Sequence, residues 1–278
     1  MRWAAGRPLS ALDLKRPRSA AHSASALLGM PSSLAARNVS HRFGSVVALD
    51  DVSIDVPAGS ATALVGESGS GKTTLLRCFN RLTEPERGEV LVGDRDVRAQ
   101  DVIPLRRGIG YVQQHGGLIP HWRVLKNVAL VPTLLGATDA DAKASDALEL
   151  VGLPADQFGS RFPHELSGGQ RQRVALARSI AAKPDVILLD EPFGALDAIS
   201  RADLQTSFDQ LRRQLNVTTL LVTHDLAEAA RLADDVVVMR RGKIEQRGPM
   251  RRLVSEPATE YVARLIEQAR ASLEGLFA

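Results

Sequence analysis

Ala61-Thr62-Ala63-Leu64-Val65 leads directly into Gly66-Glu67-Ser68-Gly69-Ser70-Gly71-Lys72-Thr73. The first segment is an apolar run of strand length, and the second matches the phosphate-loop pattern G-x-x-x-x-G-K-[ST]. A helical pattern follows, from Thr73 to Phe79. Strand, glycine-rich loop and helix in this order predict an α/β fold. They also predict a polyphosphate site at the helix N-terminus, where backbone N–H groups point at the ligand.

Each part of this loop has an expected role. Glycines let the backbone close around the phosphates without a Cβ clash. Lys72 is expected to reach the β- and γ-phosphates, and the Thr73 hydroxyl to bind Mg²⁺. An incidental Gly/Ser turn is the alternative, and the flanking strand and helix argue against it. The residues expected to contact the nucleotide here are Gly66, Glu67, Ser68, Gly69, Ser70, Gly71, Lys72, Thr73 and Thr74.

Further short apolar runs predict the remaining strands of the core. Continuous apolar runs suit parallel strands that are covered on both faces. The turn Arg241-Gly242 predicts a hairpin between the last two strands. Residues 44–45 and 48–51 are expected to connect the first two strands. The expected strands span residues 39–43, 52–56, 61–65, 89–92, 109–112, 185–189, 217–222, 236–239 and 243–246.

A helical pattern occupies residues 116–182, between two of these strands. Asp139 to Val151 is amphipathic, and we expect Ala142, Leu148 and Val151 along its buried side. A further helix is expected from Thr259 to Leu276. The sequence therefore predicts an α/β architecture with a helical insertion.

Two adjacent carboxylates follow the apolar run 185–189. Ligands bind at the carboxyl ends of the strands in open α/β sheets, so Asp190 is expected to bind Mg²⁺ there. Glu191 is expected to polarise the attacking water as a general base. Adjacent carboxylates are often only solvated surface, and the apolar run before this pair argues against that alternative.

Ser167-Gly168-Gly169 precedes a second helical segment, residues 171–178, and predicts a second anion site at a helix N-terminus. One chain thus has two phosphate-binding surfaces for one triphosphate. A head-to-tail pair of chains with two-fold symmetry resolves this. Asp225-Leu226-Ala227-Glu228 has the pattern of a capping box and predicts another helix start.

Leu166-Ser167-Gly168-Gly169-Gln170, together with the phosphate loop before it and Asp190-Glu191 after it, resembles the ATPase subunits of ABC transporters. The resemblance runs from about Leu34 to the C-terminus. It implies a P-loop NTPase (RecA-like) core with a small antiparallel β subdomain and a helical subdomain insertion. The expected organisation is a disordered basic leader (1–33), an ATPase domain (34–255) with its helical subdomain at about 116–182, and a helical tail (256–278).

The resemblance also implies roles for single residues. Phe43 is expected to stack on adenine, with a core phenylalanine as the alternative. Gln114 is expected to sense Mg²⁺ and water, and His224, which could otherwise be structural, to contact the γ-phosphate. Asp197 is expected to link the two ATP sites of the dimer. The residues expected to bind the partner's ATP are Ser167, Gly168, Gly169 and Gln170. The implied cofactors are ATP and Mg²⁺, with Thr73, Gln114 and Asp190 around the metal.

The segment from Ile109 to Trp122 resembles the ATPases of quaternary-amine osmoprotectant importers, as do residues 127–136 and 161–165. This implies a homodimer on the cytoplasmic face of the membrane, bound to permease subunits and served by a solute-binding protein. An importer for another small solute is one alternative. A soluble, non-transport ABC ATPase is another, but the coiled-coil insertion or zinc site of DNA-repair members is not evident.

Composition narrows the remaining classes of partner and cellular setting. Residues 1–30 carry five basic side chains and one acidic one, a net charge of +4, so the rest carries −1 of the total +3. A near-neutral domain argues against nucleic acid as a partner. Cys78 is the only cysteine, so a disulfide framework within the chain is excluded, and a buried role is expected. A membrane-spanning helix needs a run of about 18 apolar residues, and the sequence contains none.

Overall fold

The computed structural model describes residues 31–114, 116–194 and 196–277. Residues 1–30 of the predicted leader lie outside the described residues, as do His115, Ala195 and Ala278. The domain boundaries at residues 33 and 255 stay predictions. No helix in the described part of the chain is both long and apolar enough to cross a membrane.

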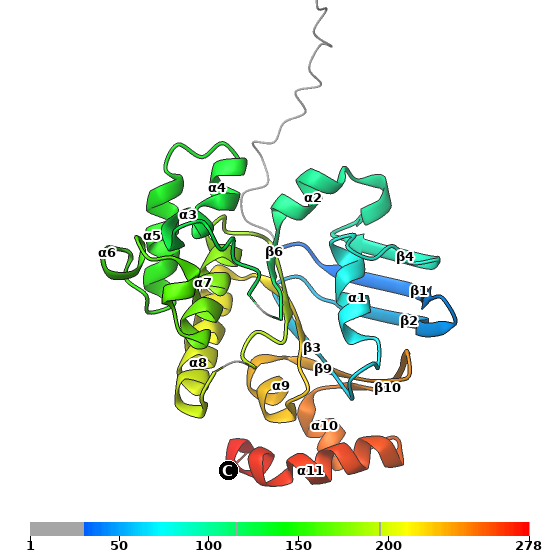
Figure 1. Ribbon diagram of the computed structural model, residues 1–278. Helices are drawn as coiled ribbons and strands as arrows, with labels where there is room; N and C mark the ends of the chain where they lie inside the picture. The colour runs from blue at the N-terminus through cyan, green and yellow to red at the C-terminus, as the bar shows by residue number, and fades with distance from the viewer. Residues whose placement is uncertain (1–30, 115, 195, 278) are drawn as a thin grey trace, which may run out of the picture. The chain divides into compact units, whose positions relative to one another are not determined.

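A six-stranded sheet forms the centre of the described region, in the order β10-β9-β3-β8-β7-β6 (Figure 1). β10 is antiparallel to β9, and the other pairs are parallel. The predicted parallel core and its terminal hairpin are therefore confirmed. The strands are β3 (Ala61–Val65), β6 (Ile109–Val112), β7 (Val186–Asp190), β8 (Thr218–Val222), β9 (Asp235–Arg240) and β10 (Lys243–Gly248).

A second, antiparallel sheet has the order β2-β1-β4-β5. It contains β1 (Leu34–Phe43), β2 (Val46–Val56), β4 (Arg87–Val92) and β5 (Arg95–Asp96). The predicted antiparallel subdomain is confirmed, but residues 48–51 belong to β2 and do not connect two strands. Register shifts between β1 and β2 interrupt the alternation of side chains, with Asn38 and Asp51 at positive φ. This bulged backbone places two consecutive aspartates inside a strand.

Helices occupy the predicted segments after the phosphate loop, in the insertion, after Asp225 and in the tail, and the described residues form three further α-helices outside those segments. Those of the core and tail are α1 (Lys72–Phe79), α2 (Val102–Gly108), α8 (Ala198–Leu215), α9 (Leu226–Leu232), α10 (Met250–Ser255) and α11 (Glu260–Phe277). The insertion holds α3 (Val124–Val128), α4 (Leu130–Leu134), α5 (Ala140–Leu150), α6 (Ala155–Phe158) and α7 (Gly168–Ile180). Figure 1 shows α3 to α6 gathered away from the antiparallel sheet. Short 3₁₀ turns span Val97–Ala99 and Pro163–Glu165.

Two details of the insertion differ from the sequence prediction. Its first helix begins at Val124, because the Asn127 side chain bonds to backbone groups of Ile119, Trp122 and Arg123 and holds that segment as a loop. The buried side of α5 also differs: Ala142 is exposed. The apolar residues that this helix buries are Ala144, Ala147 and Leu148, followed by Val151 just after it.

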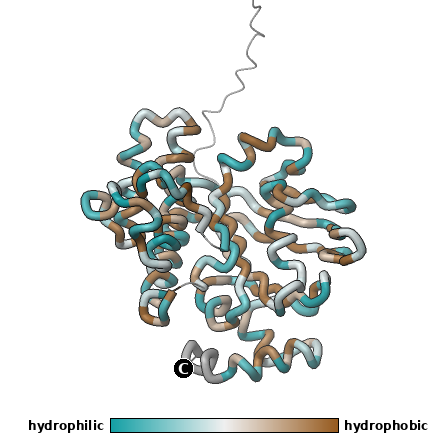
Figure 2. Tube along the Cα trace, viewed as in Figure 1, coloured by the Kyte–Doolittle hydropathy of each residue, from teal (hydrophilic) through white to brown (hydrophobic). Residues whose placement is uncertain are grey.

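Both faces of the central sheet are covered, which explains its continuous apolar runs. Leu64 of β3 packs on one face with α1 and the antiparallel sheet, and these residues form the first hydrophobic cluster. Ala63 and Val65 pack on the other face with α7, α8 and α9, and these residues form the second hydrophobic cluster. Figure 2 shows hydrophobic residues following the central strands. Cys78 lies in the first cluster with no exposed surface, as predicted. Burial raises the pKa of its thiol to about 12.

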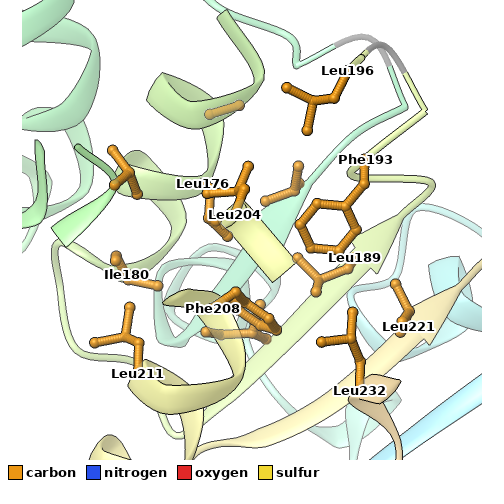
Figure 3. Packing of buried hydrophobic residues seen from close by; sticks show 14 of the residues in the cluster. Leu176, Ile180, Leu189, Phe193, Leu196, Leu204, Phe208, Leu211, Leu221 and Leu232 are labelled. Atoms are coloured by element: carbon orange, nitrogen blue, oxygen red, sulfur yellow. The ribbon is translucent and has the colours of Figure 1, made fainter. Parts of the chain in front are cut away.

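Phe208 of α8 anchors the second cluster. Its ring lies 6.3 Å from that of Phe193, among leucines from α7, α8, β7 and β8 (Figure 3). Both rings are fully buried. The cluster therefore fixes the segment after Glu191 against the sheet.

Phe208→Ala is expected to lower the free energy of unfolding by about 3–5 kcal/mol, because it removes a ring from a packed core and leaves a cavity. Urea titration at neutral pH measures this loss. Ile199→Ala on the same helix is the control, since Ile199 is 77% exposed. Equal losses in the two variants would contradict the assignment of Phe208 to the core.

Candidate functional site

The phosphate loop connects β3 to α1, as predicted. Gly66, Gly69 and Gly71 have φ of 145°, 79° and 102°. A Cβ on Gly66 would overlap the carbonyl oxygen of Met239, and one on Gly71 that of Ala48. The loop therefore closes tightly against neighbouring backbone, and only glycine fits at these two positions.

Lys72, the first residue of α1, lies at the centre of the loop. Its ammonium donates to the carbonyl oxygens of Gly66 (2.8 Å) and Glu67 (2.7 Å) and to the Ser70 hydroxyl (3.2 Å). Burial lowers the pKa of Lys72, while nearby carboxylates oppose that shift; these belong to Glu191, Asp190 and Glu67. The chain thus places one buried basic side chain inside the phosphate loop, held by oxygen atoms of three loop residues.

Thr73 and Asp190 meet across the start of α1 and the end of β7. The Thr73 hydroxyl donates to Asp190 Oδ1 at 2.8 Å. Asp190 is 1% exposed, and its Oδ2 has no hydrogen-bond partner among the described residues, with Arg77 at 3.6 Å. Burial raises the pKa of Asp190, against the Thr73 bond and the Arg77 charge. A hydroxyl beside a buried carboxylate with a free oxygen fits the oxygen ligands that Mg²⁺ prefers.

Two of the other predicted site residues lie close to the Glu191 carboxylate. Gln114 donates its amide to Glu191 Oε2 at 3.0 Å, and His224 Nδ1 lies 3.6 Å from the same oxygen. Among the described residues, the Gln114 side chain thus has its hydrogen bond to Glu191 and none to Thr73 or Asp190. The Glu191 backbone has φ of 48° and donates to the carbonyl of Val222. β8 therefore fixes the direction in which this carboxylate leaves β7.

A pocket of about 310 Å³ joins the phosphate loop to Phe43, Gln114 and Glu191. Phe43 is 56% exposed, so it is no core residue, and its ring lies edge-on to His41 at 4.5 Å. The loop residues that line this pocket are Ser68, Gly69, Ser70, Gly71, Lys72, Thr73 and Thr74.

A separate pocket of about 480 Å³ lies at the N-terminus of α7. The Ser167 hydroxyl accepts from the Gln170 N–H at 3.2 Å, and the Gln170 side chain accepts from the Ser167 N–H at 3.0 Å. Asp197, the N-cap of α8, lines the same pocket. Its lining includes Ser167, Gly168, Gly169 and Gln170 and shares no residue with the phosphate-loop pocket.

Comparison with known proteins identifies this arrangement. Residues 49–194 match the protein family described as ABC transporter. The chain belongs to this family. It is 42% identical over 229 residues to the carnitine transport ATP-binding protein of Listeria monocytogenes, covering 82% of this chain and 57% of the relative. It therefore spans less than three-fifths of that relative's length.

Two further relatives carry different solute names. The glycine betaine uptake ATP-binding protein YehX of Escherichia coli is 43% identical over 227 residues, which cover 81% of this chain and 73% of the relative. The sulfate/thiosulfate import ATP-binding protein of Mycobacterium tuberculosis is 46% identical over 235 residues, which cover 84% of this chain and 66% of the relative.

A solved structure of the ATP-binding cassette MJ0796, a dimer in a post-hydrolysis state with ADP and Pi, has a TM-score of 0.71 to this ABC family member. The two are 30% identical, over 78% of this chain and 98% of the other.

Two residues near the phosphate loop and Asp190 were not predicted from the sequence. Arg77 faces Asp190, and its position four residues after Thr73 on α1 could have shown that both share one helix face. The Tyr261 hydroxyl accepts a hydrogen bond from the Glu67 N–H at 3.1 Å. No local pattern relates these two residues, which are 194 positions apart.

The predicted capping box at Asp225 forms only in part. Asp225 Oδ1 accepts from the N–H groups of Ala227 and Glu228, as a cap does. Glu228 does not bond back, because the Asp225 N–H donates to the Thr223 hydroxyl. Glu228 is instead buried and accepts from the Gln205 amide at 3.3 Å.

Glu228 therefore ionises unusually. Burial, and then the Asp225 charge, raise the pKa of Glu228 from 4.5 to about 8, while Thr223, Arg201 and Gln205 act in the opposite direction. The folded protein retains a proton that the unfolded chain has already released above pH 4.5. The free energy of unfolding consequently falls as pH rises from about 4.5 to about 8 and then levels off.

Glu228→Gln is expected to remove this dependence, because an amide keeps the shape of the protonated carboxyl. The variant should gain about 10 °C in Tm over the natural chain at pH 9 relative to pH 5. A pKa raised from 4.5 to about 8 is worth about 4 kcal/mol between these two pH values, and 1 kcal/mol shifts Tm by about 2–4 °C at this size. Thermal scans at the two pH values measure the change. Glu149→Gln, at an exposed position on α5, is the control; a pH-independent gain in Glu228→Gln would refute the buried proton.

Proposed function

We propose that this chain is the ATP-hydrolysing subunit of an ABC importer. The observation that carries the proposal is the convergence of the phosphate loop, Gln114 and Glu191 on one pocket, with His224 beside Glu191. A polyphosphate cradle next to a carboxylate with two polar neighbours suits transfer of a phosphoryl group to water.

Each side chain has a role in this reaction. The loop N–H groups and Lys72 hold the phosphates of ATP. Thr73 and Asp190 hold Mg²⁺, which neutralises charge on the phosphate oxygens when bound. Glu191 accepts the proton of the attacking water, while Gln114 and His224 orient that carboxylate and the γ-phosphate. Phe43 stacks on the adenine ring, since its exposed face borders the same pocket.

The working unit is a head-to-tail homodimer. Ser167, Gly168, Gly169 and Gln170 line a pocket separate from the phosphate loop, so in one chain they cannot contact the same nucleotide. In the dimer they close over the ATP held by the partner chain. Asp197 lies beside them and links the two sites. The dimeric state of the similar ATP-binding cassette supports this arrangement.

The transported solute passes through separate permease subunits, so the dimer works at the cytoplasmic face of the membrane. A groove of about 290 Å³ between the core and the insertion is lined by Gln113, which adjoins Gln114, and offers a permease contact. It also includes Arg106, Tyr111, Gly117, Ile119, Leu130, Val131 and Arg178.

A quaternary-amine osmoprotectant, delivered by a solute-binding protein, is the proposed solute. The likeness of residues 109–122 to such importers motivates it, as do the carnitine and glycine betaine relatives. Import of an oxyanion is the second candidate, because the sulfate/thiosulfate relative reaches 46% identity.

Deletion of the gene for this chain is expected to abolish uptake of labelled glycine betaine, choline or carnitine, because the permeases would lose their ATPase. Restoration by the natural chain, and not by Glu191→Gln, is the control. Loss of sulfate uptake with unchanged amine uptake would favour the second candidate and leave the ATPase proposal intact.

Glu191→Gln is expected to lower ATP hydrolysis on the order of 10²-fold or more while ATP still binds, because the carboxylate acts on water. This variant should form a stable dimer with ATP in size-exclusion chromatography. Addition of Ser167→Arg should prevent the dimer sterically and leave nucleotide binding to the monomer unchanged. A dimer in the double variant would contradict the shared site.

A further inference from the structure

The C-terminal helix α11 reaches the phosphate loop through one hydroxyl group. The backbone N–H of Glu67 donates to Tyr261 Oη at 3.1 Å, and Tyr261 is only 8% exposed. Tyr261 lies in the first turn of α11, whose apolar side packs on α9 through Val262 and Ile266. The loop therefore has a fixed attachment to a helix outside the strand–loop–helix unit.

This hydrogen bond acts on the same peptide unit that holds Lys72. The Glu67 N–H, from which Tyr261 accepts its hydrogen bond, and the carbonyl of Gly66 belong to one planar amide. That carbonyl accepts from the Lys72 ammonium at 2.8 Å. Rotation of this amide would turn the carbonyl away from Lys72 while breaking the bond to Tyr261.

Arg240 holds Tyr261 and Glu67 from a third side. Its guanidinium carbon lies 4.5 Å from the centre of the Tyr261 ring, and its Nε lies 3.8 Å from Glu67 Oε1. Arg240 ends β9, and Gly242 two residues later donates its N–H to the Ser70 carbonyl at 3.0 Å. The loop is thus attached through Ser70 to the turn between β9 and β10, and through Glu67 to α11.

α11 also packs against α9, the helix that begins two residues after His224. A shift of α11 would move both the amide behind Lys72 and the support of α9. Besides its packing in the hydrophobic cluster, Tyr261 has a hydrogen bond to the loop and a ring contact with Arg240, and neither interaction involves Gln114 or Glu191. The effect on nucleotide binding is therefore separable from the effect on water activation.

We propose that Tyr261 is a positioning residue for nucleotide binding: its hydroxyl orients the Gly66–Glu67 amide, and through it Lys72, so that the placement of α11 sets the affinity for ATP. This inference rests on the proposed ATPase function and adds a means of regulating it. Any partner that displaces α11 would weaken ATP binding without contacting the pocket.

Tyr261→Phe tests this, because it removes one oxygen and keeps the buried ring. The KM for ATP is expected to rise about fivefold, equivalent to about 1 kcal/mol, the typical net value of one hydrogen bond. The kcat should stay within twofold and Tm within about 2 °C. The Kd for ADP, measured by calorimetry, should rise by the same factor as the KM.

Glu267→Gln is the matched control on α11, at a pair with Arg270 that is exposed to solvent. It should keep the natural KM; a rise equal to that of Tyr261→Phe would overturn the proposal, as would an unchanged KM and Kd in Tyr261→Phe.

Arg240→Met should also raise the KM for ATP, and it should add little to the effect of Tyr261→Phe when the two are combined, because both act through one amide. Full additivity would contradict that shared route. Absence of ATP hydrolysis in the natural chain would instead refute the underlying function.

Discussion

The hydrogen bond between the Thr73 hydroxyl and the Asp190 carboxylate joins the two halves of the candidate site. Thr73 is the second residue of α1, and Asp190 ends β7, 117 residues later in the chain. The bond can form only if β3 and β7 lie in one sheet with their carboxyl ends aligned, which β8 between them ensures. The burial of this carboxylate is tolerable because a hydroxyl and a guanidinium face it. The sheet order, the covering of both faces and the placement of Glu191 all depend on that alignment.

The site combines tight and loose parts for physical reasons. Backbone contacts behind Gly66 and Gly71 leave no space for a side chain, so the loop has one shape. Phe43, which lines the pocket, and His224, which lies beside Glu191, are by contrast exposed. A rigid phosphate loop with exposed flanking residues is the arrangement expected of a binding site that a second protein surface completes. The capped start of α7, with Ser167 and Gln170 bonded to each other, offers such a surface on each chain.

Much of this could be predicted from local patterns, because the signals are short. β3 and β6 have the predicted bounds, and the phosphate loop, Asp190 and Glu191 lie at the predicted strand ends. The bulge in β2 was missed because two aspartates at a register shift imitate a turn. The face of α5 was misjudged at Ala142, since small residues give a weak periodic signal. The spacing of Glu228 after Asp225 matched a capping box, but Glu228 is buried beside Gln205 from another helix. Tyr261 depends on a contact across 194 positions, and only the folded chain shows it.

The separation of the two pockets has a genetic consequence. In the proposed dimer each nucleotide is held by Lys72 of one chain and covered by Ser167 of the other. A chain altered at Ser167 still holds its own nucleotide normally and damages the one held by its companion. In a cell that makes both forms, mixed pairs would contain one intact and one broken site. The altered allele would therefore interfere with the natural one, although the altered chain folds and binds ATP by itself.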